Sequence, residues 1–199
     1  MNVWRDRLFR WFAPLARRCP LSPNAITWIA LALNVIAAAL LSQRWFLVAM
    51  VVLIIGGLAD AFDGIVARVQ NKTSLYGDFL DHFADRVSDV LLVTGWLFGN
   101  GVRPEITVAV VIIVLLNGYL GTQIEATWHE RNYDTVGRGE FVLALVVFPI
   151  VSHILFGNGW NRIALARFTI AEWMSLLLIV FAILGAGQRF ALAGRLHRR

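Results

Sequence analysis

Six long apolar stretches restrict the fold of this 199-residue chain more than any other feature of its sequence. A helix needs about 20 apolar residues to cross the roughly 30 Å hydrocarbon core of a bilayer. We therefore predict an all-α integral membrane protein with a six-helix transmembrane bundle over residues 24–186. The predicted spans are Asn24–Leu41, Trp45–Val66, Phe79–Phe98, Ile106–Ala126, Phe141–Phe156 and Ala171–Ala186. No Pro/Ser-rich linker divides the chain, so we expect a single domain over residues 1–199.

The composition agrees with a membrane setting. Hydrophobic residues make up 58% of the chain and charged residues only 16%, whereas a soluble domain carries about 25% charged residues. This excludes an ordinary soluble enzyme and a disordered chain. The net charge of +5 would favour nucleic acid as the partner of a soluble protein. Because the arginines flank the apolar stretches, we expect the bilayer to be the partner of these charges, and no nucleic acid.

The first 18 residues form a separate, basic segment. Its large apolar side chains recur every three or four residues, with arginines at other positions. This pattern predicts an amphipathic helix over residues 1–18 that lies in the membrane interface; an exposed solubilising helix is the alternative. The apolar positions are Trp4, Leu8, Trp11, Phe12 and Leu15, and the basic positions are Arg5, Arg7, Arg10, Arg17 and Arg18.

Basic residues are distributed unevenly between the two sides that six spans would create. An even number of spans places both termini on one side of the membrane, and that side would hold most of the 18 lysines and arginines. Lysine and arginine concentrate in cytoplasmic loops. We therefore expect a multi-pass protein of the cell membrane with cytoplasmic termini.

Acidic residues gather where the second and third stretches approach this cytoplasmic side. Asp60 and Asp63 are three positions apart and Asp81 and Asp85 are four apart, so each pair shares a helix face. Two helices joined by a short loop are expected to be antiparallel neighbours, which lets the two faces meet. Carboxylates that face one another repel unless cations lie between them, and oxygen ligands suit a hard ion such as Mg²⁺ or Mn²⁺.

Small and basic residues accompany the acidic ones. Gly56, Gly57, Gly64 and Ala67 lie on or near the first acidic face, where small side chains allow a helix or a flat ligand to come close. Arg68 ends this helix and could neutralise a phosphate. Metal ions, a phosphate-binding arginine and a spare carboxylate are the parts that metal-assisted phosphoryl-type transfer needs.

The same residues form a longer string with a fixed spacing. It reads Asp60-x-x-Asp63-Gly64-x-x-Ala67-Arg68, then eight residues, then Gly77-x-x-x-Asp81-x-x-x-Asp85. All fixed positions match the signature DxxDGxxAR(x)8GxxxDxxxD, so the chain resembles the CDP-alcohol phosphotransferases. Six spans, the N-terminal interfacial helix and Pro23-Asn24-x-x-Thr27 also look like that family. The resemblance covers essentially the whole chain.

The resemblance implies an enzyme of phospholipid biosynthesis that transfers a phosphatidyl-type group from a CDP-lipid to a small alcohol and releases CMP. The CDP-lipid would be CDP-diacylglycerol or CDP-archaeol. By motif position, two divalent ions, Mg²⁺ or Mn²⁺, would be bound by Asp60, Asp63, Asp81 and Asp85, and Asp85 would be the general base. The CDP-lipid would contact Asn24, Thr27, Gly64, Ala67, Arg68 and Gly77. The resemblance also suggests a homodimer.

The acceptor alcohol is predicted from a later part of the chain. Residues 118–123, Arg131-x-Tyr133 and residues 137–140 look most like the inositol-phosphate-using prokaryotic members, which make phosphatidylinositol phosphate or archaetidylinositol phosphate. Arg131 and Arg138 would then hold the phosphate of inositol phosphate; the alternative is that they are ordinary cytoplasmic loop charges. Glycerol 3-phosphate is the second candidate acceptor.

Functions of two other classes fit this sequence less well. Intramembrane carboxylates also mark the paths of ion or solute transporters, but a transporter would spread its acids along a route between inverted repeats. Here the acids gather at one end of two neighbouring stretches. An aromatic prenyltransferase with Asp-rich motifs resembles this chain less, because it shows two separate motifs and more spans. We expect His82 to turn away from the carboxylates and not to be a ligand.

Overall fold

Helices make up nearly all of the protein in the part of the chain that the structure describes. The structure is a computed structural model that describes residues 3–128 and 138–198. Its helices are α1 (Val3–Arg18), α2 (Pro23–Ser42), α3 (Phe46–Val69), α4 (Leu75–Asn100), α5 (Pro104–Trp128), α6 (Arg138–Gly157) and α7 (Ile170–Leu196). A 3-10 turn, η1 (Trp160–Arg162), and two short strands, β1 (Ala164–Leu165) and β2 (Phe168–Thr169), connect α6 to α7.

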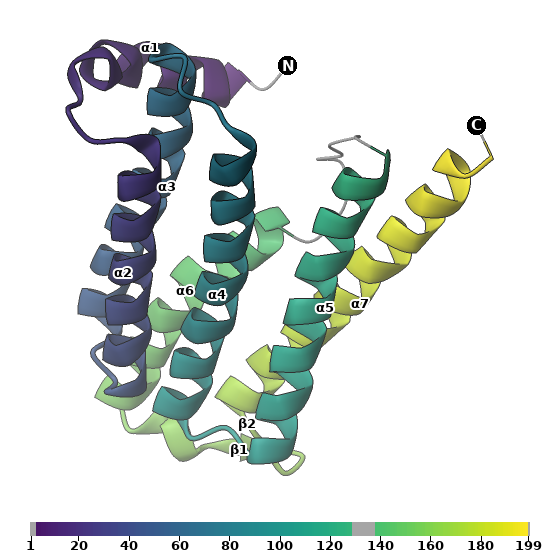
Figure 1. Cartoon of the computed structure of the whole chain (residues 1–199). Helices are drawn as coiled ribbons and strands as arrows, with labels where there is room; N and C mark the ends of the chain where they lie inside the picture. Colours follow the sequence, from purple (N-terminus) through teal and green to yellow (C-terminus); the bar gives the residue numbers. More distant parts are fainter. Residues whose placement is uncertain (1–2, 129–137, 199) are drawn as a thin grey trace.

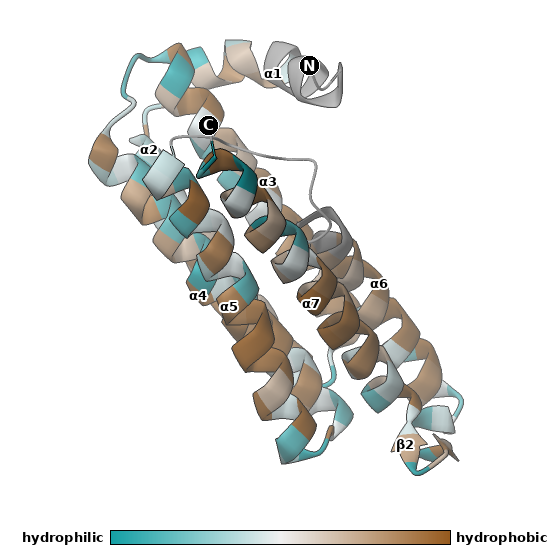
Figure 2. Ribbon diagram, turned by 90° about the vertical axis from the view of Figure 1, so that its right-hand side faces the viewer, coloured by the Kyte–Doolittle hydropathy of each residue, from teal (hydrophilic) through white to brown (hydrophobic). Residues whose placement is uncertain are grey.

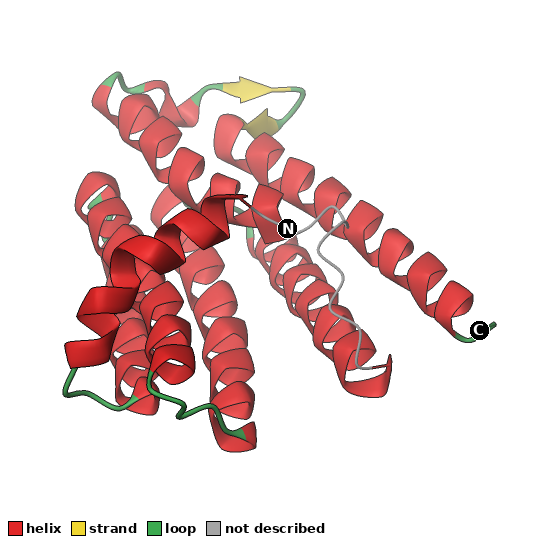
Figure 3. Cartoon of the chain, turned by 90° about the horizontal axis from the view of Figure 1, so that it is seen from above, coloured by secondary structure: helices red, strands yellow, loops and turns green. Residues whose placement is uncertain are grey.

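The long helices run up and down a bundle, and α1 lies across one of its ends (Figures 1 and 3). α2 packs most extensively against α3 and α4, and α5 packs mainly against α7. Because α1 is followed by an even number of long helices, α1 and the last turn of α7 lie at the same end of the bundle (Figure 1).

Each of the six predicted spans falls on one of the helices α2 to α7. Four of these helices, α2, α3, α5 and α7, are long and apolar enough to cross a membrane. α4 is 26 residues long but carries the acidic residues, and the apolar part of α6 that the structure describes, Leu143–Gly157, is shorter. Figure 2 shows hydrophobic residues along most of α5, α6 and α7. The chain is therefore a multi-pass helical protein with four candidate spans among the described residues; membrane crossing by α4 and α6 stays a prediction.

Two features of the C-terminal part differ from the prediction. α7 continues ten residues beyond the predicted end at Ala186, because a helix can extend into the polar region after its apolar stretch has ended. The strands β1 and β2 were not foreseen. They form an antiparallel hairpin whose two turn residues, Ala166 and Arg167, both have positive φ, the backbone that a tight two-residue hairpin needs.

Side-chain caps fix the helix ends that surround the acidic residues. The Ser22 hydroxyl accepts a hydrogen bond from the Ala25 amide at the start of α2, where Pro23 is the first residue. The Ser74 hydroxyl accepts one from the Gly77 amide at the start of α4. Such caps satisfy amides that a helix leaves unpaired, so the positions where α2 and α4 begin are set locally.

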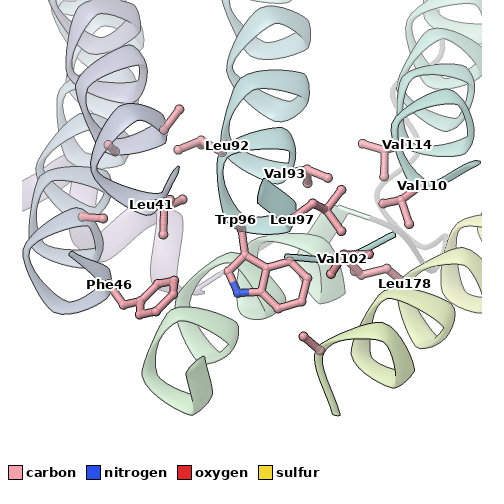
Figure 4. Close-up of a cluster of buried hydrophobic side chains, with 14 residues drawn as sticks. Leu41, Phe46, Leu92, Val93, Trp96, Leu97, Val102, Val110, Val114 and Leu178 are labelled. Atoms are coloured by element: carbon pink, nitrogen blue, oxygen red, sulfur yellow. The ribbon is translucent and has the colours of Figure 1, made fainter. Parts of the chain in front are cut away.

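The main apolar core gathers around the C-terminal part of α4, which lies at the end of the bundle away from α1 (Figure 1), and Figure 4 shows its side chains. Gly95 and Gly99 of α4 lie directly against α2, where an added Cβ would overlap the backbone of Ala38 and of Leu41. The buried Trp96 indole donates a hydrogen bond of 2.9 Å to the Ser152 hydroxyl of α6. The large labelled members are Leu41, Phe46, Leu92, Val93, Trp96, Leu97, Val102, Val110, Val114 and Leu178. These contacts hold α2, α4 and α6 together.

A smaller core attaches α1 to the other end. Ala16 of α1 is buried together with Ile26, Ile65 and Val66. The side-chain amide of Gln70 donates hydrogen bonds of 2.9 Å to the carbonyls of Ala16 and Cys19. α1 is therefore fixed to the end of α3; its amphipathic position in the membrane interface stays a prediction.

Candidate functional site

The acidic residues gather at the end of the bundle that α1 covers. Asp60 and Asp63 lie in the last part of α3, and Asp81 and Asp85 lie in the first part of α4. The two acidic faces meet, as expected, although in the described residues each of the two helices packs mainly along α2 and little along the other. The start of α2 therefore belongs to the same region as the two acidic faces.

Three of the four predicted metal ligands come together. Carboxylate oxygens of Asp60, Asp63 and Asp81 lie within 4.8 Å of one another. Asp63 is only 6% exposed, and the Thr27 hydroxyl donates a hydrogen bond of 2.6 Å to its Oδ2. Carboxylates this close repel one another, so a divalent cation held by oxygen atoms is a ligand that fits this donor set. Thr27 orients one of the carboxylates.

A second group of possible metal ligands also contains Asp81. One donor atom each from Asp81, His82 and Asp85 lie within 4.8 Å of one another. The expectation that His82 turns away from the carboxylates is therefore wrong. His82 precedes Asp85 by three positions, a spacing that puts both side chains on one helix face. The sequence therefore contained a signal for His82, because the same three-residue spacing placed Asp60 and Asp63 on one helix face.

Asp85 has a cation as its neighbour on α4. The Arg86 guanidinium lies 3.2 Å from the Asp89 carboxylate and 3.9 Å from that of Asp85, and the Asp85 side chain is only 11% exposed. Gly118 of α5 makes room for Arg86, because a Cβ there would overlap the guanidinium. Sequence analysis missed this role of Arg86, although a glycine inside the apolar stretch of α5 indicated a close approach.

The residues predicted to contact the CDP-lipid lie at the same end. Arg68 is exposed at the end of α3, and its Nε donates a hydrogen bond of 2.8 Å to the carbonyl of Gly64. An added Cβ on Gly77 would lie 3.3 Å from the Asn24 Oδ1 atom, so the glycine leaves space beside a polar side chain. Ala67 is half-buried in the last turns of α3. Their contact with a CDP-lipid stays a prediction.

The two arginines predicted for the acceptor phosphate are less well placed by the structure. Arg131 lies outside the described residues, and Arg138 is the first residue of α6. Sequence analysis missed another cation, Arg189 of α7, whose guanidinium donates to the carbonyl and to the side-chain oxygen of Asn117 in α5. Arg189 lies beyond the predicted end of the last span, where the sequence pattern gives no sign of a contact with α5.

Comparison with known proteins agrees with this arrangement. Residues 20–184 match the family described as CDP-alcohol phosphatidyltransferase. An archaetidylinositol phosphate synthase of Pyrococcus horikoshii is 33% identical over 142 residues, which cover 69% of this chain and 73% of the relative. An archaetidylinositol phosphate synthase of Aeropyrum pernix is 37% identical over 155 residues, which cover 76% and 78%.

Solved structures show the same fold. The crystal structure of Mycobacterium tuberculosis phosphatidylinositol phosphate synthase with CDP-DAG bound has a TM-score of 0.67 and 22% identity, and the match covers 92% of each chain. The same enzyme in complex with manganese and citrate has a TM-score of 0.65 and 23% identity, covering 90% of this chain and 87% of that chain. At this identity the likeness concerns the fold alone.

The family match spans the motif, the acidic residues and all but the ends of the helical bundle. It supports a transferase of phospholipid synthesis over the transporter that the intramembrane carboxylates also allowed. The chain belongs to the CDP-alcohol phosphatidyltransferase family, and it is a membrane enzyme of that class.

Proposed function

We propose that this enzyme transfers the phosphatidyl-type group of a CDP-lipid to inositol phosphate and releases CMP. The observation that carries the proposal is the pair of donor groups that share Asp81, in a chain whose motif residues match the family. Relatives named archaetidylinositol phosphate synthase support inositol phosphate as the acceptor over glycerol 3-phosphate.

Asp60, Asp63, Asp81 and Asp85 would hold two divalent cations, Mg²⁺ or Mn²⁺. When bound, these ions neutralise the pyrophosphate of the CDP-lipid and the departing CMP. The clustered carboxylates support a cation at this place, since they would otherwise repel one another. The manganese complex of the related mycobacterial enzyme is in keeping with a divalent ion.

The chemistry needs one proton transfer and one displacement at phosphorus. The acceptor hydroxyl oxygen would attack the lipid-bearing phosphorus, the bond from that phosphorus to the oxygen of CMP would break, and Asp85 would accept the hydroxyl proton. Asp85 is suited to this role because it belongs to only one of the two donor groups, so it is less committed to the ions than Asp81. Arg68 would pair with a phosphate of the CDP-lipid, and Arg131 and Arg138 with the phosphate of the acceptor.

We further propose that α2 to α7 all cross the membrane, with the carboxylate end in the cytoplasm and the protein in the cell membrane. The 26 residues of α4 and the 20 residues of α6 are long enough to span, and the basic residues near α1 and the C-terminus support a cytoplasmic end. A homodimer is proposed from the family resemblance, and light scattering of the purified protein would test it.

Release of CMP by the purified protein tests the reaction. CDP-diacylglycerol and CDP-archaeol would each be offered with inositol 1-phosphate, glycerol 3-phosphate or serine in the presence of Mg²⁺. We expect release with inositol 1-phosphate. The Asp85→Asn variant should lose about 10²- to 10⁴-fold in turnover, the range of a general base, while it keeps CDP-lipid binding. Release with glycerol 3-phosphate alone would replace the proposed acceptor, and no release with any pair would contradict the proposal.

A further inference from the structure

His82 brings a nitrogen donor to a group of oxygen ligands. Its ring lies within 4.8 Å, donor atom to donor atom, of the Asp81 and Asp85 carboxylates. The side chain is 23% exposed, so its neighbours cover most of it. The group around Asp60 and Asp63 contains only carboxylates, so the two groups that share Asp81 differ in chemistry.

Two further carboxylates lie near the same imidazole. The His82 Nε2 atom is 3.9 Å from the Asp78 Oδ2 atom and 4.0 Å from the Glu125 Oε2 atom. Glu125 comes from α5 and is itself 26% exposed. A histidine that binds a metal usually has a carboxylate near its ring, which orients the imidazole and raises its basicity as a ligand. At these distances neither carboxylate forms a hydrogen bond with the ring, but a small rotation of the ring would let Asp78 of α4 or Glu125 of α5 accept one from the nitrogen that does not bind the metal.

The separation of the donors suits one ion. A cation with ligand distances of about 2.1 Å can hold donors up to about 4.2 Å apart on opposite sides. Donor atoms within 4.8 Å therefore need only a small rotation of one side chain to surround an ion. The histidine is free to make that rotation, because its contacts with Asp78 and Glu125 are longer than hydrogen bonds.

We propose that the cation position between Asp81 and Asp85 takes a ring nitrogen of His82 as a third protein ligand, which makes this position selective for Mn²⁺ or a similar transition ion over Mg²⁺. This inference rests on the proposed function, since it concerns one of the two ions proposed there. Mg²⁺ prefers oxygen ligands and gives up its water reluctantly, whereas imidazole nitrogen suits divalent transition ions. The all-carboxylate position around Asp60 and Asp63 would keep no such preference.

Pulsed electron paramagnetic resonance of bound Mn²⁺ tests the ligand directly. The full-length protein in detergent would be loaded with Mn²⁺, and its spectrum examined for the coupling of a directly bound ¹⁴N nucleus. We expect this coupling in the wild type, its change to a ¹⁵N coupling when the histidines are labelled, and its loss in His82→Gln. The matched control is His197→Gln, at the exposed end of α7, which should keep the coupling.

Metal competition gives a second measurement. In His82→Gln, the preference for Mn²⁺ over Mg²⁺ should fall at least about tenfold, with the helical circular dichroism spectrum unchanged. Bound Mn²⁺ without a ¹⁴N coupling in the wild type, or an unchanged preference in His82→Gln, would overturn the inference.

CMP release by the same preparations separates the two proposals. A wild type that turns over without the coupling contradicts only the histidine ligand, and one that shows the coupling but no transfer contradicts only the proposed reaction.

Discussion

The two ends of α4 are built in opposite ways. Near its C-terminus, Gly95 and Gly99 lie against the backbone of α2, and the buried Trp96 closes an apolar core (Figure 4). Near its N-terminus, Gly77 leaves space beside the polar Asn24, and half-buried aspartates extend toward α3. At the C-terminal end the backbone of α4 directly contacts that of α2. At the N-terminal end charged side chains lie between α4 and α3.

This difference assigns stability and chemistry to separate parts of the same helices. Small residues let backbones approach closely, which is a main source of helix association in membranes. At the acidic end, like charges would push α3 and α4 apart when no cation is bound. The apolar contacts therefore fix the position of α4 relative to α2. Because Asp63 is held by Thr27 of α2 and Asp81 lies on α4, this position also sets the distance between the two carboxylates. Substitutions at the acidic end should therefore lower metal binding and turnover, and substitutions at the apolar end should lower the stability of the fold.

The largest effect is expected at Asp81, because both donor groups share it. Asp81→Asn should lower CMP release by at least about 10³-fold, since the ions supply several kcal/mol of stabilisation to the transition state. Its thermal unfolding temperature, followed by circular dichroism in detergent without metal, should stay the same or rise slightly, because one of several mutually repelling charges is removed. Glu105→Gln, at an exposed acid in the first turn of α5 and outside both donor groups, is the control. Loss of less than tenfold in Asp81→Asn would contradict the shared-ligand arrangement.

A smaller effect at the same end is expected from Thr27. Thr27→Val keeps the shape of the side chain but removes the hydrogen bond to Asp63. Loss of a group that orients a metal ligand typically weakens metal binding about 10- to 100-fold, which titration with Mn²⁺ would measure. Thr107→Val, at a buried threonine of α5, should leave Mn²⁺ binding unchanged. Equal weakening in both variants would show a general loss of packing.

At the apolar end, Gly95→Ala should affect stability and not chemistry. The new Cβ would overlap the backbone of Ala38, which no side-chain rotation can relieve, and overpacking of this kind typically destabilises by about 1–3 kcal/mol. Unfolding in mixed detergent–SDS micelles would measure the loss. Gly187→Ala, at an open position of α7, should be neutral or slightly stabilising. If Gly95→Ala folded normally but lost turnover selectively, the separation of the two ends would be refuted.

Much of this arrangement was predictable from the sequence, and the remainder depended on three-dimensional packing. Apolar length located α2 to α7, and the spacing of Asp60, Asp63, Asp81 and Asp85 located the site. The sequence could not show that α2 packs against both α3 and α4, because apolar helices carry few signals of which neighbour they choose. His82 was predictable from its spacing to Asp85, but its neighbour Glu125 comes from α5, which only the fold brings close.

The end of α7 and the hairpin before it could not be predicted from the sequence, for a different reason. Hydropathy measures where a helix is apolar and not where it ends, so the polar last turns of α7, with Arg189, fell outside the predicted span. The strands β1 and β2 contain only two residues each, too few for a pattern of alternating burial to appear. The positive φ of Ala166 and Arg167 also has no signal in these residue types.

The smallest effect on stability is expected from the buried hydrogen bond between Trp96 and Ser152 at the apolar end. Ser152→Ala removes the acceptor of the Trp96 indole hydrogen bond. Hydrogen bonds between membrane helices contribute about 0.6 kcal/mol on average, so a double-mutant cycle of Ser152→Ala with Trp96→Phe, measured by unfolding in mixed micelles, should give a coupling near that value. Ser175→Ala is the control, because its equally buried hydroxyl donates only to the carbonyl of Ala171 in its own helix. CMP release per folded molecule should stay the same in all of these variants. A loss of turnover in Ser152→Ala that exceeds its loss of stability would mean that the apolar end also adjusts the carboxylates.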